Sequence, residues 1–170
     1  MKEKGIQEAI GAVEKINHKY GKVIYTLDIY GQIDQDQADW FTELQNSFTE
    51  EISYKGIVEY SKTYDVLKDY YALLFPTQFF TEGVPGTIID AYAAGVPVIA
   101  SKWEHFTDVI IEGETGFGYS FGDEQGLQNI LDKAYLKQEL IEDMRINCIN
   151  TAKKYLPGPS IRIIEELLDK

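Results

Sequence analysis

The stretch FTEGVPGTIIDAYAAGVPVIAS, residues 80–101, is the most patterned part of this chain. It places one acid, Glu82, beside a Gly/Pro turn and a second acid, Asp90, inside the Ala-rich run that follows. A helix start attracts anions, because its free N–H groups and the helix dipole amount to about half a positive charge. Two carboxylates around such a turn therefore indicate a ligand that has hydrogen-bond donors as well as negatively charged groups.

The turn itself has the features of a phosphate cradle. Pro76 closes the preceding apolar strand, and Pro85 stands where it can begin a helix that we expect over residues 85–94. The glycines of the turn let a ligand approach the backbone, and N–H groups at the helix start can bind phosphate oxygens. Asp90 lies about 6 Å further along the helix axis, where it could accept hydrogen bonds from ribose or sugar hydroxyls. A ligand with both phosphates and hydroxyls is a nucleotide sugar.

Outward from this stretch, helical and strand-like patterns alternate along the chain. The predicted helices cover residues 6–20, 36–48, 60–70, 85–94, 123–136, 138–156 and 161–170. Strands are predicted over residues 22–31, 51–56, 71–76 and 96–101, and a strand, a turn and a strand over residues 109–120. These strands are apolar rather than alternating, which is typical of a mainly parallel sheet covered on both faces. We expect a Rossmann-like three-layer α/β/α domain with its site outside the carboxyl ends of the strands.

The length of 170 residues suits a single domain over residues 1–170. The pattern opens with a helix, where such a domain usually opens with a strand. We therefore expect the first strand, and an N-terminal region before it, to be absent from these residues.

Charge and composition exclude several classes of function. The net charge of −12 argues against broad nucleic-acid binding and against electrostatic docking on anionic lipid. No apolar run reaches the roughly 18 residues of an integral membrane segment, so a cytoplasmic location is expected. The single cysteine, Cys148, excludes an internal disulfide and a cysteine-cluster metal site, and we expect it to be a buried structural thiol.

Residues 82–101 closely resemble the E-x7-E region of retaining glycosyltransferases of family 4, which have the two-domain GT-B fold. Four further segments resemble the same family: EKG (3–5), LDIYG (27–31), ISYKGIV (52–58) and SKWEHFTDVIIEGETGFGYS (101–120). The resemblance covers nearly the whole chain, and only as the C-terminal, donor-binding half of that fold. The order and spacing of the segments make it specific.

The resemblance implies a role for each matching residue. Glu82 matches the first acid, which contacts the donor sugar and is the candidate catalytic residue. Asp90 matches the second acid, which holds the ribose hydroxyls, although this chain has Asp where the familiar pattern has Glu. Lys4 matches the lysine that binds the diphosphate. The remaining implied substrate contacts are the phosphate-binding loop, Gly83, Val84, Pro85, Gly86 and Thr87, and the base-contacting residues Gly56 and Ile57.

The implied reaction is transfer of a sugar, with retention, from a nucleotide-diphosphate sugar to a glycan or lipid-linked acceptor. The subgroup resembled is common in bacterial capsule and exopolysaccharide assembly. The acceptor would be held by the N-terminal domain, and the full-length enzyme could associate with the membrane peripherally. No cofactor and no metal are expected, since the sequence has no histidine cluster with metal-ligand spacing and the resemblance implies a GT-B fold that handles the diphosphate without a bound metal.

Other interpretations remain open at this point. The chain could be a non-catalytic nucleotide-sugar-binding subunit of a split transferase, or a domain like that of the nucleotide-sugar 2-epimerases. A flavodoxin-type receiver is a weaker alternative, because the acidic cluster and lysine that it needs are not found. Each site residue also has a plain structural interpretation: Glu82 near a helix start, Asp90 and Lys4 as solvated charges, and Gly56 as the end of a strand.

Overall fold

The computed structural model describes residues 2–123, 125–156 and 158. The helix predicted over residues 161–170 lies outside the described residues. The strands are β1 (Leu27–Tyr30), β2 (Ile52–Gly56), β3 (Leu73–Phe75), β4 (Val98–Lys102) and β5 (Gly116–Ser120). The helices are η1 (Lys2–Lys4), α1 (Ile6–Tyr20), η2 (Gln35–Gln37), α2 (Ala38–Gln45), η3 (Tyr60–Lys62), α3 (Thr63–Leu67), α4 (Gly86–Ala93), α5 (Phe106–Val109), α6 (Gly126–Leu136), α7 (Glu139–Glu142), α8 (Arg145–Ala152) and η4 (Lys153–Tyr155).

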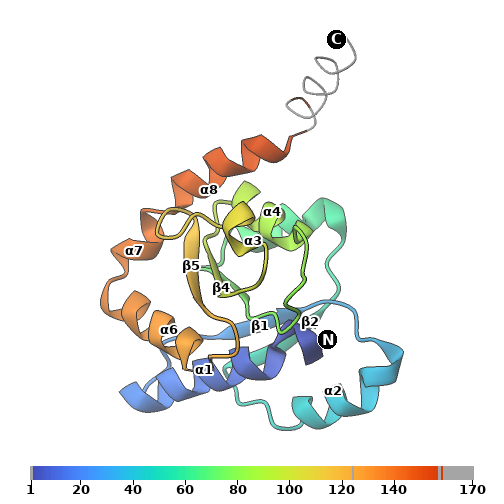
Figure 1. The fold of residues 1–170 in the computed structure, drawn as a ribbon. Coiled ribbons are helices and arrows are strands. Elements are labelled where there is room, and N and C mark those ends of the chain that lie inside the picture. The colour runs from blue at the N-terminus through green and yellow to red at the C-terminus, as the bar shows by residue number, and fades with distance from the viewer. Residues whose placement is uncertain (1, 124, 157, 159–170) are drawn as a thin grey trace.

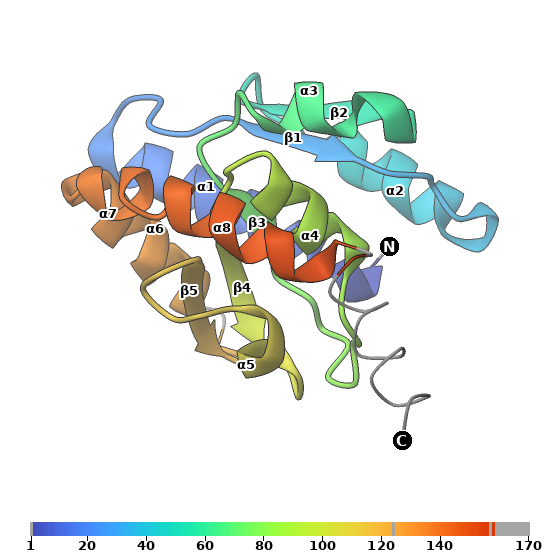
Figure 2. The same cartoon turned by 90° about the horizontal axis from the view of Figure 1, so that it is seen from above.

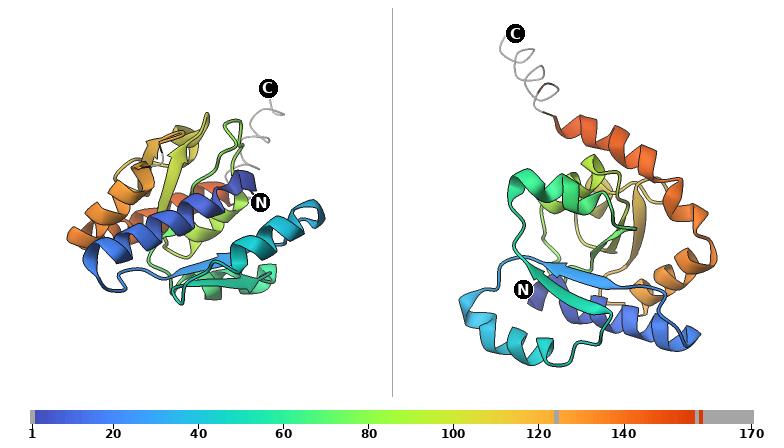
Figure 3. Two further views of the ribbon diagram at one scale, coloured as in Figure 1. Left: turned by 90° about the horizontal axis from the view of Figure 1, so that it is seen from below. Right: turned by 180° about the vertical axis from the view of Figure 1, so that it is seen from behind.

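All strand pairs of the described chain are parallel, as predicted, but they form two sheets rather than one. The first sheet has the order β1-β2 and the second has the order β3-β4-β5. Figure 2 shows β1 and β2 on one side of the molecule and β3, β4 and β5 on the other, and the right panel of Figure 3 shows β1 and β2 side by side. The prediction of a parallel α/β fold is confirmed, and the prediction of a single sheet needs this correction.

Helices cover both faces of the β3-β4-β5 sheet. On one face α1 packs beside α6, and on the other α4 packs beside α8 (Figure 1). One buried cluster combines residues of α4, β4, α5 and α8, and a second combines α1, β1, β2 and α6 with Ile99 of β4. Because β4 contributes to both clusters, its apolar residues are needed on both faces, which explains its continuous run of buried side chains.

Two predicted strands are shorter than their sequence pattern. The segment before Leu27 is not a strand, because the side chain of Asn17 takes its backbone groups: the N–H groups of Ile24 and Tyr25 donate to Oδ1 at 2.8 and 3.0 Å. The first strand predicted within residues 109–120 is absent from the described chain. There Ile111 takes part in a tight turn. Its N–H donates to Thr115 Oγ1, and its carbonyl accepts from the N–H of Thr115.

The predicted helix over residues 138–156 is interrupted. α7 and α8 are separated by a tight turn in which the N–H of Met144 donates to the carbonyl of Ile141. The helices predicted over residues 36–48 and 60–70 are also shorter, and each begins with a single 3₁₀ turn. None of the helices that the structure describes has the length and apolar character needed to span a bilayer.

Cys148 is a structural thiol, as predicted. It lies on α8 and is fully buried in the apolar cluster that α8 forms with α4, and its thiol donates to the Thr115 carbonyl at 3.5 Å. Burial raises the pKa of Cys148 to about 12, so the thiol stays protonated at neutral pH and unreactive.

Candidate functional site

The start of α1 is fixed against the carboxyl end of β3. Gly5 adopts the left-handed conformation with φ 72°, and a Cβ built there would lie 1.8 Å from the carbonyl oxygen of Pro76. Beside this contact, the N–H of Gln78 donates to the carbonyl of Glu3 at 2.7 Å. Only glycine fits at position 5, and this fit places η1 beside the loop that follows β3.

This docking brings together two of the predicted site residues. The Nζ of Lys4 lies 2.5 Å from Oε2 of Glu82. The side chain of Lys4 is 54% exposed and that of Glu82 only 17%, so the carboxylate is the more enclosed partner. The hydroxyl of Thr77 also lies 3.5 Å from the same carboxylate oxygen. Glu82 is therefore held in place, while the ammonium of Lys4 remains accessible to solvent.

The loop over residues 77–85 is anchored at both sides. Ser101, at the end of β4, donates to the carbonyl of Thr77 at 2.6 Å, and both residues are buried. The Thr77 hydroxyl accepts from the N–H of Phe79 at 3.1 Å, and the carbonyl of Phe80 accepts from the N–H of Glu104. The sequence analysis missed Thr77 and Ser101. Their signal is positional, because each polar residue ends or follows an apolar strand at the same sheet edge.

The amino end of α4 faces this loop. Pro85 is extended, with φ −72° and ψ 122°, and the helix begins at Gly86, one residue later than predicted. The preceding residues Gly83 and Val84 are exposed. Since the first N–H groups of a helix have no partner within it, those of Gly86 and Thr87 are available at this end. The predicted phosphate-binding loop is thus a short exposed turn running into a helix start.

Asp90 lies one turn further along α4, on the same face as Thr87. Its side chain is half-buried. Burial raises the pKa of Asp90 above its ordinary value. The carboxylate is therefore partly desolvated, and hydrogen bonds from a ligand's hydroxyl groups would stabilise its charged form.

Gly56 and Ile57 lie at the carboxyl end of β2. Gly56 has φ 78°, and its carbonyl accepts from the N–H of Gly31 at 2.9 Å, which joins the ends of β1 and β2. Ile57 is 70% exposed. The two residues belong to the β1-β2 sheet, whereas the Lys4–Glu82 pair lies by the loop after β3 in the other sheet, so the structure places them apart from that pair.

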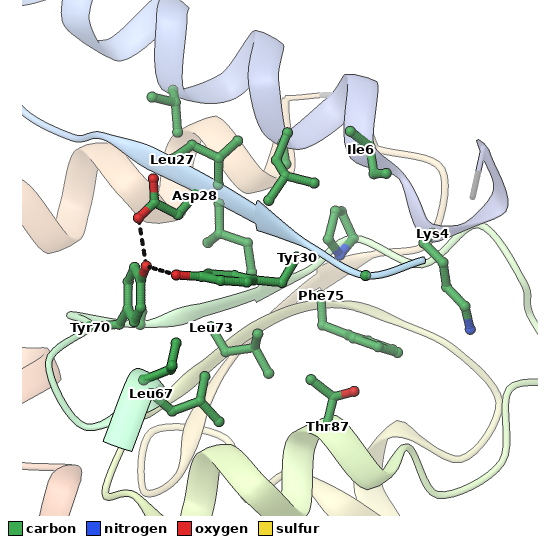
Figure 4. Close-up of a pocket in the computed structure, with 18 of the residues that line it drawn as sticks. Lys4, Ile6, Leu27, Asp28, Tyr30, Leu67, Tyr70, Leu73, Phe75 and Thr87 are labelled. Atoms are coloured by element: carbon green, nitrogen blue, oxygen red, sulfur yellow. Dashed lines mark hydrogen bonds between the residues drawn. The ribbon is translucent and has the colours of Figure 1, made fainter. Parts of the chain in front are cut away.

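A cavity of about 490 Å³ opens between β1 and β3. Lys4 and Thr87 line one end of it, as Figure 4 shows. Along its wall the hydroxyl of Tyr70 donates to Asp28 Oδ2 at 2.6 Å and lies 2.8 Å from the hydroxyl of Tyr30. Burial and these hydrogen bonds raise the pKa of Tyr70 well above its ordinary value. The sequence analysis did not predict this cavity, because it arises between two sheets.

Within residues 2–123, 125–156 and 158, no group of three or more His, Cys, Asp or Glu side chains has the arrangement of a metal site. His105, which lies near this edge in the sequence, pairs with Asp108 at 3.0 Å.

Comparison with known families and structures is consistent with this geometry. A family model described as glycosyl transferases group 1 matches residues 1–135. The C-terminal domain of a group 1 family glycosyl transferase (LpcC) from Francisella tularensis has a TM-score of 0.78 at 21% identity, over 93% of this chain and 83% of that chain. Comparison with curated proteins gave no match.

Two longer structures extend the likeness. Anabaena Alr3699/HepE in complex with UDP has a TM-score of 0.83 at 19% identity, over 100% of this chain and 46% of that chain. The pneumococcal O-GlcNAc transferase GtfA in complex with UDP and GlcNAc has a TM-score of 0.74 at 20% identity, over 99% of this chain and 33% of that chain. The chain thus spans less than half the length of either protein. At these identities the likeness shows the fold, which matches the C-terminal half of GT-B transferases.

Proposed function

The chain belongs to the glycosyl transferases group 1 family, and from that premise we propose that it is the donor-binding domain of a retaining glycosyltransferase. The observation that carries this proposal is the Lys4–Glu82 pair, which lies beside the loop that leads into α4. A cation from the start of the chain is brought there beside a carboxylate and a helix start that lie about 80 positions later in the sequence. The donor is a nucleotide-diphosphate sugar.

The diphosphate binds between Lys4 and the start of α4. The free N–H groups of Gly86 and Thr87 donate hydrogen bonds to phosphate oxygens, the positive end of the helix dipole attracts the diphosphate, and the exposed Lys4 supplies a full positive charge. Gly83, Val84 and Pro85 form the turn that leads into the helix, and Gly83 and Val84 are exposed to a ligand from solvent. The ammonium of Lys4 moves from Glu82 to the phosphates, or bridges both, when the donor binds.

The two acids bind hydroxyl groups on either side of the diphosphate. Glu82, released from part of its pairing with Lys4, accepts hydrogen bonds from the donor sugar. Asp90, one turn into α4, accepts them from the ribose, and its desolvation makes these bonds favourable. Gly56 and Ile57, at the end of β2, are assigned to the nucleotide base. The shorter arm of Asp90 requires the ribose to lie close to the axis of α4.

The same groups stabilise the departing nucleotide. When the bond from the sugar's anomeric carbon to the diphosphate breaks, the electron pair goes to a phosphate oxygen. Lys4 and the α4 N–H groups stabilise that negative charge, a form of electrostatic catalysis that needs no reorganisation of solvent. The acceptor oxygen forms the new bond and its proton leaves with the diphosphate. Glu82 is the catalytic residue of this proposal, since it touches the reacting sugar.

The remaining parts of the proposal concern the whole enzyme. An N-terminal domain would hold a glycan or lipid-linked acceptor, and chemistry would take place between the two domains. We place the reaction in bacterial capsule or exopolysaccharide assembly, in the cytoplasm or at the membrane surface. The lengths of two similar structures support this division, because the chain covers 46% of the length of HepE and 33% of that of GtfA.

Calorimetric titration of the chain with UDP, GDP and ADP tests the proposal. We expect one nucleoside diphosphate to bind, and Lys4→Ala to weaken it at least tenfold, since a charge-assisted hydrogen bond contributes about 1.5–3 kcal/mol. Lys15→Ala is the matched control, because Lys15 is an exposed lysine on the same amino-terminal segment, within α1. It should leave the affinity unchanged.

Failure of all three nucleotides to bind a folded chain would refute the donor-binding proposal. Equal losses for Lys4→Ala and Lys15→Ala would show that the binding is diffuse attraction rather than a site. Turnover by these residues alone at the rate of a full transferase would contradict the two-domain division. Binding without turnover, even after an N-terminal half is supplied, would favour the non-catalytic subunit.

A further inference from the structure

Large apolar side chains lie exposed on and beside the loop that carries Glu82. Phe79, Phe80 and Val84 belong to this loop, and Phe121 follows β5. A single exposed apolar residue is ordinary on a protein surface, whereas several at one place are typical of a binding site. These four lie at the carboxyl edge of the β3-β4-β5 sheet, the edge at which doubly wound domains bind their ligands.

Two of these side chains contact each other edge to face. The ring centroids of Phe80 and Phe121 lie 5.2 Å apart, and the angle between the ring planes is 78°. Such a pair uses the edge of one ring and one face of the other, which leaves three ring faces outside the contact. The side chains of Phe80 and Phe121 are 50% and 38% exposed. The two rings therefore form an open, nearly right-angled corner, which we call the aromatic corner.

Backbone hydrogen bonds hold the first ring of the aromatic corner in place. The N–H of Glu82 donates to the carbonyl of Phe79 at 3.2 Å, which makes Phe80 a central residue of a tight turn over residues 79–82. The carbonyl of Phe80 accepts from the N–H of Glu104 at 2.9 Å. Phe80 is therefore fixed both within its own turn and to the segment that follows β4.

A second turn carries the other ring. The N–H of Asp123 donates to the carbonyl of Ser120 at 3.0 Å, so Phe121 and Gly122 are the central residues of a turn directly after β5. Gly122 has φ 79°, the conformation that glycine supplies in such a turn. Because both rings stand on hydrogen-bonded turns at strand ends, the aromatic corner exists before any ligand binds.

The aromatic corner lies beside the candidate site, on the side away from Lys4. Lys4 is placed at the end of β3, whereas Phe80 is bonded to the segment after β4 and Phe121 follows β5. The strand order is β3-β4-β5. Glu82 pairs with Lys4 and also closes the turn that carries Phe80. Glu82 therefore lies between the proposed diphosphate site and the aromatic corner.

The charges around the aromatic corner indicate what it binds. Glu82 and Glu104 are both bonded to the turn of Phe80, and their carboxylates only accept hydrogen bonds. Lys102, a cation at the same edge, pairs with Glu112 at 3.3 Å. The face of an aromatic ring is negatively polarised, so it attracts C–H groups whose carbon bears an oxygen. A fitting ligand therefore combines hydroxyl donors with a flat C–H face, as a neutral pyranose sugar does.

Other occupants fit these charges less well. A hydrocarbon chain has no hydrogen-bond donors for the two carboxylates. An anionic lipid surface, or a second copy of this chain with its net charge of −12, would bring like charges together.

We propose that the aromatic corner is a subsite for one neutral sugar ring of the glycan acceptor. One phenyl face stacks on the C–H groups of the sugar, the other ring forms a side wall, and the carboxylates accept from its hydroxyls. The donor sugar lies on the Lys4 side of Glu82 and the acceptor sugar on the other side. The donor-binding half then takes part in selecting the acceptor. Assignment to the acceptor rests on the proposed function, whereas binding of a sugar ring at the corner does not.

Titration with methyl β-D-glucopyranoside, followed through the amide shifts of Thr81 and Gly122 by NMR, tests the subsite. Phe80→Leu and Phe121→Leu keep an apolar side chain but lose the ring face, and each should weaken binding about fivefold. Phe80→Tyr and Phe121→Tyr keep the face and should bind as the parent does. Phe79→Leu is the matched control, since Phe79 is an exposed phenylalanine of the same loop and the ring contact belongs to Phe80. It should leave the affinity unchanged.

Octyl β-D-glucopyranoside, used below the concentration at which it forms micelles, separates a sugar from a hydrocarbon chain. In saturation-transfer NMR its ring C–H protons should receive more saturation from the protein than its octyl protons. Stronger transfer to the octyl chain would assign the corner to a hydrocarbon and overturn the proposal. So would the absence of sugar binding, equal losses for all three leucine variants, or dimerisation that Phe121→Leu abolishes. Methyl β-D-glucuronide should bind more weakly than the neutral glucoside, and equal affinity would contradict the role of the carboxylates.

The same titration with nucleotide present distinguishes this inference from the proposed function. Methyl β-D-glucopyranoside should still bind the parent chain saturated with UDP or with UDP-glucose. Displacement by UDP-glucose but not by UDP would assign the corner to the donor sugar and overturn the acceptor subsite. Nucleotide binding without glucoside binding would refute the subsite and leave the donor-binding function intact. Glucoside binding by a folded chain that binds no nucleotide would support a sugar site at the corner and refute its assignment to an acceptor.

Discussion

The Nζ of Lys4 and the Oε2 of Glu82 lie 2.5 Å apart, although 78 positions separate the two residues in the sequence. With Lys4 more than half exposed, such an ion pair contributes only about 0–1 kcal/mol to stability. Its importance is the placement of opposite charges at the mouth of the loop leading into α4. A ligand with phosphates and hydroxyls can use both charges, which a ligand with phosphates alone cannot.

Glu82→Gln should raise the affinity for UDP and reduce the additional affinity that the sugar of a UDP-sugar contributes. Removing the carboxylate frees Lys4 and removes a negative charge near the phosphates, so UDP should bind a few-fold more tightly. The additional affinity contributed by the sugar should fall, because the amide accepts weaker hydrogen bonds than a carboxylate. Calorimetry with UDP and UDP-glucose measures both affinities; an equal fold-change for the two ligands would contradict a sugar contact by Glu82.

Asp90→Asn should stabilise the chain while weakening nucleotide binding. Burial raises the pKa of Asp90 in the folded state, so the folded protein binds more protons than the unfolded one, and stability is lost as the pH rises from the ordinary Asp pKa of 3.8 through the raised value. At pH 7 the charged form carries this full cost, and the substitution removes it. Thermal unfolding should show a higher midpoint at pH 7 and little difference at pH 3.

The control for this prediction is Asp143→Asn, since Asp143 is exposed in the turn between α7 and α8. It should alter neither the midpoint nor the affinity. A stable Asp90→Asn variant that binds every nucleotide as well as the parent would refute the ribose role of this residue.

Gly5→Ala should destabilise the chain by about 2–4 kcal/mol. A left-handed conformation costs a residue with a Cβ roughly 1–2 kcal/mol, and here the Cβ would also lie 1.8 Å from the carbonyl oxygen of Pro76. Gly21→Ala is the matched control, because Gly21 has φ 62° with no atom within 4 Å of its Cβ. It should cost only the conformational part. Urea unfolding compares the two; equal losses would show that the contact with Pro76 does not fix α1.

Ser101→Ala should cost about 1–3 kcal/mol and loosen the loop over residues 77–85. Its hydroxyl bonds at 2.6 Å to the carbonyl of Thr77, and both residues are buried, so the substitution leaves a buried carbonyl unsatisfied. Ser47→Ala removes a bond of the same length to Leu44 in an exposed setting, where water replaces it. That control should cost less than about 0.5 kcal/mol. Nucleotide affinity should fall for Ser101→Ala alone; an unchanged affinity would show that this anchor does not support the site.

Local sequence patterns predicted several elements well. The helix predicted over residues 6–20 has the bounds of α1. The bounds of the helix predicted over residues 85–94 and of the strand predicted over residues 96–101 differ from those of α4 and β4 by one or two residues. These segments have a clear apolar period and a glycine or proline at their ends, and both signals act within a few residues. The GT-B half-fold was predicted from the same stretch, by resemblance, and is confirmed.

Segments whose backbone bonds to distant or unexpected partners were not predicted. The strand expected from residue 22 begins only at Leu27, because Asn17 of α1 takes the backbone groups of residues 24 and 25. The buried hydrogen bond from Ser101 to Thr77 was also not predicted, since two hydroxyl residues 24 positions apart are not joined by any local sequence pattern. The roles of all the candidate site residues stay predictions, because no contact in the structure tests them.

The sequence by itself determined the parallel α/β class, the acid-bearing turn into α4 and the candidate residues Glu82 and Asp90, because period, turn chemistry and helix starts are local properties. Only the tertiary structure decided that Lys4 pairs with Glu82, that Gly5 must pack on Pro76, and that two sheets leave a cavity between β1 and β3. These contacts depend on which strand edges and helix ends lie next to one another in space. The packing of whole helices and strands around a common core sets that arrangement, and no short stretch of sequence determines it.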